Sequence, residues 1–180
     1  KNNFELVNKP TNIGKLEKKI KVNLKNNQKF IEFSPLSYNY LKIISKKINQ
    51  SKGGLLIIDY GYLDPQMKDT LQSIHKHKFD NIFENFSNSD ITHNVSFNLI
   101  KKILKKLNLK VVGITSQKKF LTKLGIINRA ETIAKNLKFS KKANIYYRLN
   151  RLVDDKFMGN LFKVMFATKK NNKFNTGFEN

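Results

Sequence analysis

The hydrophobic pattern is clearest over residues 55–58, where four apolar residues follow one another without alternation. Two glycines precede this run, and an acid, an aromatic residue and a third glycine follow it. Such a run predicts a strand that is buried on both faces, as in a parallel sheet covered by helices. Ligands of open α/β sheets bind beyond the carboxyl ends of the strands, so Asp59 and Tyr60 fall where a site is expected. The competing interpretation is structural, because an acid after a strand is also a common turn residue.

Helical periodicity appears on both sides of this strand. Ser34 and Pro35 have the character of an N-cap and a first helical residue, and apolar residues then recur at positions 36, 40, 43, 44 and 48. A second stripe, at positions 97, 100, 103, 104 and 107, predicts a helix that begins after Ser96. Further helices are predicted over residues 118–136, with a break near Gly125, and over residues 145–152.

The remaining segments predict strands, a lid and a tail. Strands are expected at residues 4–7, 19–24, 29–33, 110–115 and 161–167. Residues 62–95 are polar and irregular, with a short helix expected at 67–74, and a segment of this length beside a strand end is typical of a lid. The sequence therefore predicts one α/β domain over residues 1–167, with residues 62–95 as its lid insertion and residues 168–180 as a flexible basic tail.

Composition narrows the possible classes of protein. The formal charge is +22, but only three of the 35 basic residues are arginine, and the lysines are spread over the whole length. Scattered lysine disfavours nucleic-acid binding, which needs a clustered basic face and favours arginine. The chain has no cysteine, which excludes a thiolate nucleophile, and no apolar run of membrane-spanning length. Its first residue is lysine, so we expect a processed chain or a piece of a longer one.

Three histidines and an acid lie in the lid segment: His75, His77, Asp90 and His93. Their spacing matches no strong metal signature, so we predict no metal site. A histidine that joins the lid to the strand end by hydrogen bonds is the favoured interpretation, and a general base is the alternative.

Several separated motifs occur in a characteristic order. They are Glu32-Phe33-Ser34-Pro35, the segment 53–61, Asp69-Thr70-Leu71-Gln72, His77, Asp90-Ile91-Thr92 with Val95 and Phe97, Thr115-Ser116-Gln117, Phe120-Leu121, Leu124-Gly125-Ile126, and the segment 158–164. Over residues 32–167 the chain resembles the C-terminal half of the MidA-type methyltransferases, a family that includes a mitochondrial complex I assembly factor that methylates an arginine. The resemblance implies a Rossmann-like class I methyltransferase fold, in which residues 55–58, 110–115 and 161–167 form the fifth, sixth and antiparallel seventh strands.

The resemblance also implies the chemistry. The cofactor is S-adenosylmethionine, whose glycine-rich loop is expected upstream of Lys1 because no such loop is legible here. Asp59 and His77 are the implied catalytic residues, and the implied substrate-binding residues are Glu32, Tyr60, Gly61, Asp90 and Thr92. The family has His or Asp where this chain has Asn94, and an acid where it has Ser96, so proton transfer by those two positions is not expected.

Partners and location follow from the same resemblance. The implied substrate is a protein subunit of a respiratory complex, in the mitochondrial matrix of a eukaryote or the cytoplasm of a bacterium. The missing N-terminal half, or a second chain, would complete the sheet, and a homodimer is a further option. Without that half we expect the chain to be inactive. The alternatives are a non-catalytic half-domain that serves as an assembly or scaffolding protein and, third, a basic nucleic-acid binder.

Overall fold

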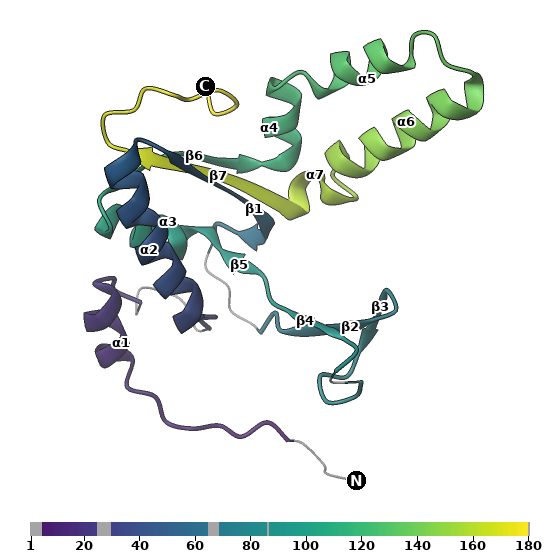
Figure 1. Ribbon diagram of the computed structural model, residues 1–180. Helices are drawn as coiled ribbons and strands as arrows, with labels where there is room; N and C mark the ends of the chain where they lie inside the picture. Colours follow the sequence, from purple (N-terminus) through teal and green to yellow (C-terminus); the bar gives the residue numbers. More distant parts are fainter. Residues whose placement is uncertain (1–4, 25–29, 65–68, 86, 180) are drawn as a thin grey trace.

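The computed structural model describes residues 5–24, 30–64, 69–85 and 87–179. Its centre is a four-stranded mixed sheet in the order β5-β1-β7-β6 (Figure 1). The strands are β1 (Gly54–Tyr62), β5 (Val95–Ser96), β6 (Leu109–Ser116) and β7 (Phe162–Lys169). Strand β7 runs antiparallel to both β1 and β6, whereas β5 pairs with β1 in parallel. The three predicted methyltransferase strands and the antiparallel last strand are thus confirmed.

One face of this sheet is covered by two helices, α2 (Pro35–Ser51) and α3 (Phe97–Lys106). Both helices begin where the sequence predicted, because Ser34 and Ser96 accept hydrogen bonds from the backbone N–H groups of Ser37 and Leu99. The core between helices and sheet is apolar and includes Phe97, Leu104 and Met165, all fully buried. Leu55 and Ile57 of β1 pack against this core.

The other face of β1 differs from the prediction. Leu56 and Ile58 are 47% and 45% exposed, so β1 is covered on one face only. The predicted buried stripe of α2 is also wrong in part, since Leu36, Tyr40 and Ile43 are exposed while Tyr38, Leu41 and Ile48 are buried. The physical reason is that α2 lies on the sheet through the neighbouring stripe, which includes a buried serine, Ser45.

The N-terminal region contains a helix in place of the predicted strands. Helix α1 (Ile13–Ile20) begins at Asn12, whose side chain accepts a hydrogen bond from the Lys15 N–H. Val22 and Leu24 follow in a segment without regular secondary structure, and both side chains are buried. Their burial explains the alternation of apolar and polar residues that suggested a strand at 19–24. The Leu24 N–H donates a hydrogen bond to the Glu17 carboxylate and not to the backbone of a neighbouring strand. No strand occurs among the described parts of 4–7 and 29–33, while Phe4 and Lys29 lie outside the described residues.

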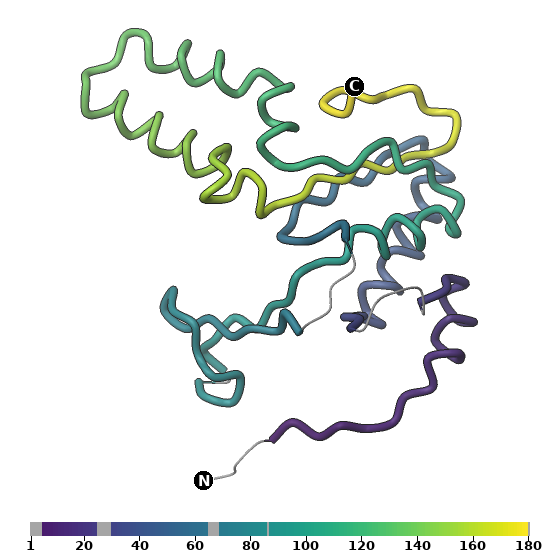
Figure 2. The backbone as a smooth tube through the Cα atoms, turned by 180° about the vertical axis from the view of Figure 1, so that it is seen from behind, coloured from purple at the N-terminus to yellow at the C-terminus, as the bar shows by residue number. Residues whose placement is uncertain are grey.

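The lid segment folds as a second, small sheet. Strands β2 (Gln72–His75), β3 (Lys78–Asp80) and β4 (Asp90–Thr92) pair antiparallel in the order β3-β2-β4. The helix expected at 67–74 is wrong for residues 72–74, which belong to β2, and residues 67 and 68 lie outside the described ranges. We call β2, β3 and β4 the three-stranded sheet. It projects from the body of the molecule (Figures 1 and 2).

The second projection is helical. Helices α4 (Gln117–Lys123) and α5 (Ile126–Ala134) are separated at Gly125, where the sequence predicted a break. Gly125 has a φ of +80°, which glycine adopts more freely than other residues. Helix α6 (Phe139–Val153) returns antiparallel to α5, and α7 (Met158–Leu161) leads into β7. We call residues 126–153 the helical arm. It extends to the same side of the molecule as the three-stranded sheet (Figures 1 and 2).

The tail predicted to be flexible makes specific contacts through its described part, up to Glu179. Phe174 and Phe178 pack against Phe166 of β7, with ring centroids 5.3 and 6.3 Å away, and Phe178 also lies 5.2 Å from Phe120. These aromatic contacts partly cover the sheet face opposite α2 and α3. Strand β7 also continues through Thr168 and Lys169, beyond the predicted boundary at 167.

Candidate functional site

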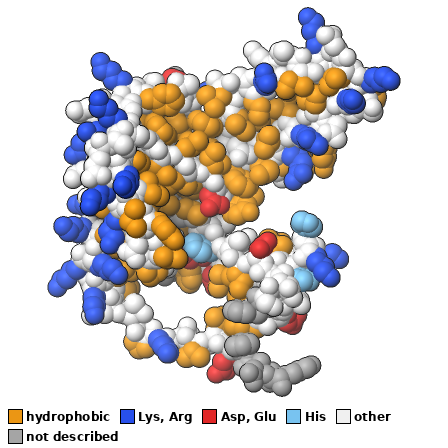
Figure 3. Space-filling view, in the orientation of Figure 1, with side chains coloured by type: hydrophobic (Ala, Val, Ile, Leu, Met, Phe, Trp, Pro, Cys, Tyr) orange, Lys and Arg blue, Asp and Glu red, His pale blue; other side chains and the backbone are white. Residues whose placement is uncertain are grey.

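A pocket of about 350 Å³ opens at the carboxyl end of β1. We call it the Asp59 pocket. Its walls come from the start of α2, the end of β1, the segment between β4 and β5, and α3. The residues that line it are Glu32, Phe33, Ser34, Ser37, Tyr38, Leu41, Asp59, Tyr60, Ile91, Thr92, His93, Val95, Ser96, Leu99, Ile100 and Ile103. Space-filling Figure 3 shows a hollow on this side of the molecule, between the helical arm and the three-stranded sheet.

Asp59 and Tyr60 form the strand wall of the pocket. An oxygen of the Asp59 carboxylate accepts a hydrogen bond from the Tyr60 N–H at 2.8 Å. Among the described residues no lysine or arginine forms an ion pair with Asp59. The Tyr60 ring packs on Phe162, the first residue of β7, with centroids 4.6 Å apart. The pocket therefore presents a carboxylate without a cationic partner beside a fixed aromatic ring.

Gly61 is needed where β1 meets β5. A Cβ atom at this position would lie 2.3 Å from the Val95 carbonyl oxygen and 2.6 Å from the Phe97 ring. Backbone contacts that close exclude any side chain, so glycine allows the two strands to pair at Gly61 and Val95. This pairing brings the β4–β5 segment against the end of β1 and closes one side of the pocket.

Glu32 lies in the pocket wall, but its carboxylate is already engaged. The side chain is 9% exposed, and its two oxygens lie 2.6 and 2.7 Å from the Thr70 hydroxyl. The Thr70 N–H also donates to Glu32, at 3.2 Å, and the Thr70 hydroxyl accepts from the Asn94 N–H at 2.9 Å. Glu32 therefore fixes the segments that enter and leave the three-stranded sheet, whatever part it takes in binding.

His93 lines the pocket; the sequence analysis considered it only with the other lid histidines, as a hydrogen-bonding link to the strand end or a general base. Its Nδ1 atom lies 3.1 Å from the Asn94 carbonyl oxygen and 4.0 Å from a Glu32 oxygen. A carbonyl only accepts, so Nδ1 carries a proton in this contact. The signal in the sequence was its place directly after Thr92, in a segment already assigned to the site.

The other predicted site residues are not all brought together. Thr92 lines the pocket, and its hydroxyl accepts from the Gln72 side chain at 3.2 Å. Asp90 begins β4 and is exposed outside the pocket lining. His77 lies in the turn between β2 and β3 with φ at +64°, exposed and also outside the lining. Its predicted catalytic role stays a prediction that this position does not support.

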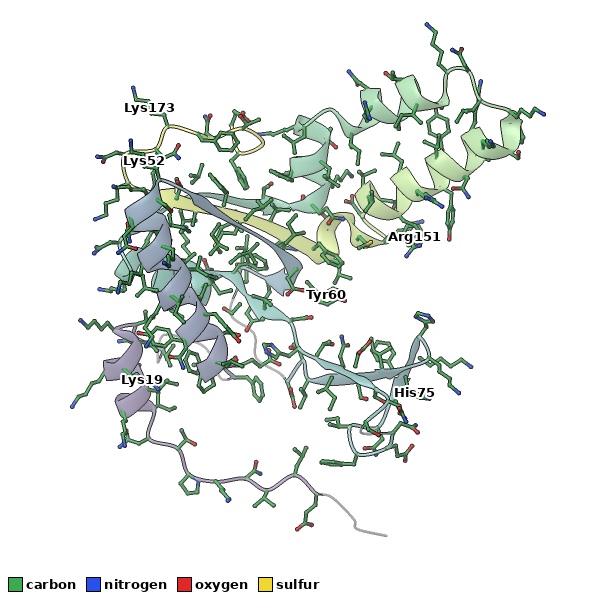
Figure 4. All side chains as sticks on the ribbon, viewed as in Figure 1. Lys19, Lys52, Tyr60, His75, Arg151 and Lys173 are labelled. Atoms are coloured by element: carbon green, nitrogen blue, oxygen red, sulfur yellow. The ribbon has the colours of Figure 1, made fainter. Side chains whose placement is uncertain are left out.

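The described residues contain neither a candidate metal cluster nor a membrane-spanning helix. Within the described ranges, no group of three or more His, Asp or Glu side chains could hold a metal ion. His75, which lies on the three-stranded sheet (Figure 4), contacts the Asn88 carbonyl oxygen at 3.0 Å. No helix in the described part of the chain is both long and apolar enough to cross a bilayer.

Solved structures share this fold. A protein of the COG1565 superfamily from Burkholderia thailandensis superposes with a TM-score of 0.69, at 21% identity over 81% of this chain and 40% of its own. A second COG1565 superfamily member from the same bacterium, solved with bound S-adenosyl-homocysteine, superposes with a TM-score of 0.64, at 21% identity over 80% of this chain and 36% of its own. Together with the strand order, these likenesses confirm the Rossmann-like methyltransferase fold.

Curated sequences are similar over most of the chain. The protein arginine methyltransferase NDUFAF7 of Xenopus tropicalis mitochondria is 26% identical over 134 residues, which are 74% of this chain and 31% of that protein. The Danio rerio protein of the same name is 25% identical over 120 residues, 67% of this chain and 28% of that protein. The Caenorhabditis elegans homologue is 27% identical over 144 residues, 79% and 33% respectively. The chain thus spans about a third of the length of these relatives.

Family membership follows from the match to a family model. Residues 1–115, more than half of the chain, match the sequence model of the family described as "Putative S-adenosyl-L-methionine-dependent methyltransferase". The Asp59 pocket is built largely from this matched region. The chain belongs to this family of S-adenosyl-L-methionine-dependent methyltransferases.

Proposed function

We propose that the chain forms the substrate side of an S-adenosylmethionine-dependent methyltransferase that acts on arginine in a protein. The observation that carries this proposal is the Asp59 carboxylate, which lies in a largely apolar pocket and forms no ion pair among the described residues. A guanidinium group is the natural partner of such a carboxylate, because its planar N–H groups match the two oxygens. The relatives named as protein arginine methyltransferases support the same substrate.

In this proposal each pocket residue has a defined task. Asp59 holds the guanidinium, and the apolar walls from Tyr60, Ile91 and Leu99 exclude water and strengthen that pairing. Alignment of the acceptor nitrogen is the main requirement of such a transfer. The methylated nitrogen must release one proton, and we assign its acceptance to His93, the only histidine among the described residues that line the pocket.

S-adenosylmethionine supplies the methyl group, and its site needs structure beyond the described residues. No glycine-rich strand-to-helix turn is present among the described residues. The edge of β1 opposite β7 pairs with β5 only at Gly61 and Tyr62, which leaves residues 55–60 without a ladder partner there in the described chain. We infer that a further parallel strand, from a preceding segment or a second chain, pairs with this edge and carries the cofactor loop.

We further propose that the substrate of the complete protein is a subunit of a respiratory complex. The resemblance implies that this complex is complex I. The mitochondrial relatives support the matrix as the location if the source is eukaryotic, and a bacterial protein would act in the cytoplasm.

The test uses the full-length gene product and methyl-labelled S-adenosylmethionine. The substrates are proteins from cells that lack the gene, and mass spectrometry identifies the modified residues. We expect methylarginine, and we expect Asp59→Asn to reduce its formation by about 100-fold while the fold is kept. Asp155→Asn is the matched control, because Asp155 is a surface acid paired with Lys118. Methylation of another residue type, or full activity of Asp59→Asn, would contradict the proposal.

A further inference from the structure

The three arginines of the chain share one location. Of 35 basic residues only Arg129, Arg148 and Arg151 are arginine, and all three lie in the helical arm. Arg129 is near the start of α5 and the other two are near the end of α6, so all belong to the base of the antiparallel arm, away from its tip. In a chain whose cations are otherwise lysine, this confinement indicates a need for the planar guanidinium fork, which pairs with carboxylates through two parallel hydrogen bonds.

The arm also carries unsatisfied charge and exposed aromatic rings. The helical arm, residues 126–153, includes seven basic residues and one acid, Glu131. Neither Arg148 nor Arg151 forms an ion pair within the described chain. Tyr146 and Tyr147 are 45% and 62% exposed. Tyrosine and arginine together are the composition typical of the energetic centre of a protein interface.

Close contacts place the base of the arm beside the Asp59 pocket. At Gly159 in α7, an added Cβ would lie 2.3 Å from the Val153 carbonyl oxygen, so the end of α6 is held directly against α7. Helix α7 continues into Phe162, whose ring packs on Tyr60 of the pocket. Figure 4 shows Arg151 at the base of the arm and Tyr60 at the end of β1, on the same side of the molecule.

We propose that the base of the arm, centred on Arg148, Arg151 and the two neighbouring tyrosines, binds acidic residues of the protein substrate that flank the target arginine. This inference rests on the proposed function and adds a preference for acidic residues around the target arginine. The tip of the arm offers only lysines, Lys135, Lys138, Lys141 and Lys142, which suit any anionic surface. The guanidinium fork fits phosphate as well as carboxylate, so it is the position of these arginines beside the proposed protein-substrate pocket that favours an acidic protein segment over a lipid bilayer or a nucleic acid.

The experiment measures binding and methyl transfer separately, with the full-length protein. The probes are two fluorescent peptides with one central arginine, flanked by glutamates in one and by glutamines in the other. Fluorescence anisotropy gives the dissociation constant, and labelled S-adenosylmethionine gives kcat/KM. We expect the acidic peptide to bind about tenfold more tightly, and the double variant Arg148→Gln/Arg151→Gln to remove that preference. Arg148→Lys/Arg151→Lys keeps the charge and should lose part of the preference.

A matched control changes the same charge at the tip. Lys138→Gln/Lys141→Gln alters two exposed cations at the start of the same helix and should leave the preference intact. Equal binding of both peptides, or equal losses from the tip and base variants, would overturn the inference, as would tighter binding to anionic vesicles or single-stranded oligonucleotides that depends on Arg148 and Arg151. Selective binding of the acidic peptide without methyl transfer would support the inference and contradict the proposed function.

Discussion

The hydroxyl of Thr70 lies within hydrogen-bonding distance of both carboxylate oxygens of Glu32, at 2.6 and 2.7 Å. Glu32 precedes α2, and Thr70 precedes the three-stranded sheet, so this contact joins the body of the protein to its projecting sheet. Because Glu32 is almost buried, its charge depends on these hydrogen bonds in the folded state.

Thr70→Val should therefore destabilise the protein although the side-chain shape is kept. Loss of the hydroxyl leaves a buried carboxylate oxygen and the Asn94 N–H without their partner, and we expect the free energy of unfolding to fall by about 1–3 kcal/mol. Urea denaturation of the full-length protein measures this change. Thr70→Ser retains the hydroxyl and should stay closer to the parent; equal losses in the two variants would show that the hydrogen bonds matter little.

Gly61→Ala should separate β1 from β5. The new methyl group would overlap the Val95 carbonyl oxygen and the Phe97 ring, and overpacking of this kind costs about 1–3 kcal/mol or more. Gly53→Ala is the control, because an added Cβ there meets only the Ser51 hydroxyl, at 3.8 Å. Thermal unfolding compares the two variants. A melting temperature unchanged by Gly61→Ala would mean that the strands do not approach this closely.

Phe178→Ala should weaken the attachment of the tail to the sheet. Phe178 contacts Phe120 and Phe166, and the loss of a partly buried aromatic ring should cost about 1–3 kcal/mol, less than a fully buried ring. Phe139→Ala removes a ring that is 87% exposed and should change stability by no more than about 0.5 kcal/mol. If the unfolding free energies of the two variants match, the tail does not contribute.

Acid should loosen the loop that joins β3 and β4. The pKa of Asp80 is lowered from 3.8, chiefly by the Asn85 side chain and also by the Asn81 N–H and the Ser89 hydroxyl. A lowered folded-state pKa contributes stability at pH values above 3.8, and that contribution is lost as the pH falls through the lowered pKa. The protection of the described loop amides, taken relative to the intrinsic exchange rate at each pH, should fall below pH 3.8. Asp80→Asn should remove this pH dependence, and its persistence would point to another group.

The exposed face of β1 should make the chain prone to association when it is produced alone. Leu56 and Ile58 lie on that face, and the neighbouring strand edge is largely unpaired in the described chain. Leu56→Lys/Ile58→Thr should raise the soluble yield of the 180-residue chain, as measured by sedimentation and size-exclusion chromatography. In the full-length protein the same changes should lower stability, because we expect that face to be covered there. A gain in both forms would argue against such cover.

Local chemistry explains which parts of the fold could be predicted. The caps at Ser34 and Ser96 and the break at Gly125 depend on one or two residues, and each was predicted from the sequence. The side of α2 that faces the sheet was not predicted correctly, because the helix carries two apolar stripes and tertiary packing selects one of them. The three-stranded sheet was missed because its strands are three or four residues long.

The same distinction applies to the candidate site. Asp59 and Tyr60 follow a legible strand and do line the pocket, as do Glu32 and Thr92. The resemblance assigned a role to His77 and none to His93, yet His93 lines the pocket and His77 lies outside the lining, in the turn between β2 and β3. Long-range contacts such as that of Glu32 with Thr70 leave no periodic signal.

The hydrogen bond from the Asn94 N–H to the Thr70 hydroxyl brings together two positions that lie 24 residues apart in the sequence. The segment between them therefore begins and ends at the same place on the body of the protein. Swapping this segment between homologous enzymes, with Thr70 and Asn94 as the junctions, should transplant its surface without altering the register of β1. Sequence variation within this segment would reshape one rim of the Asp59 pocket while the underlying scaffold stays constant.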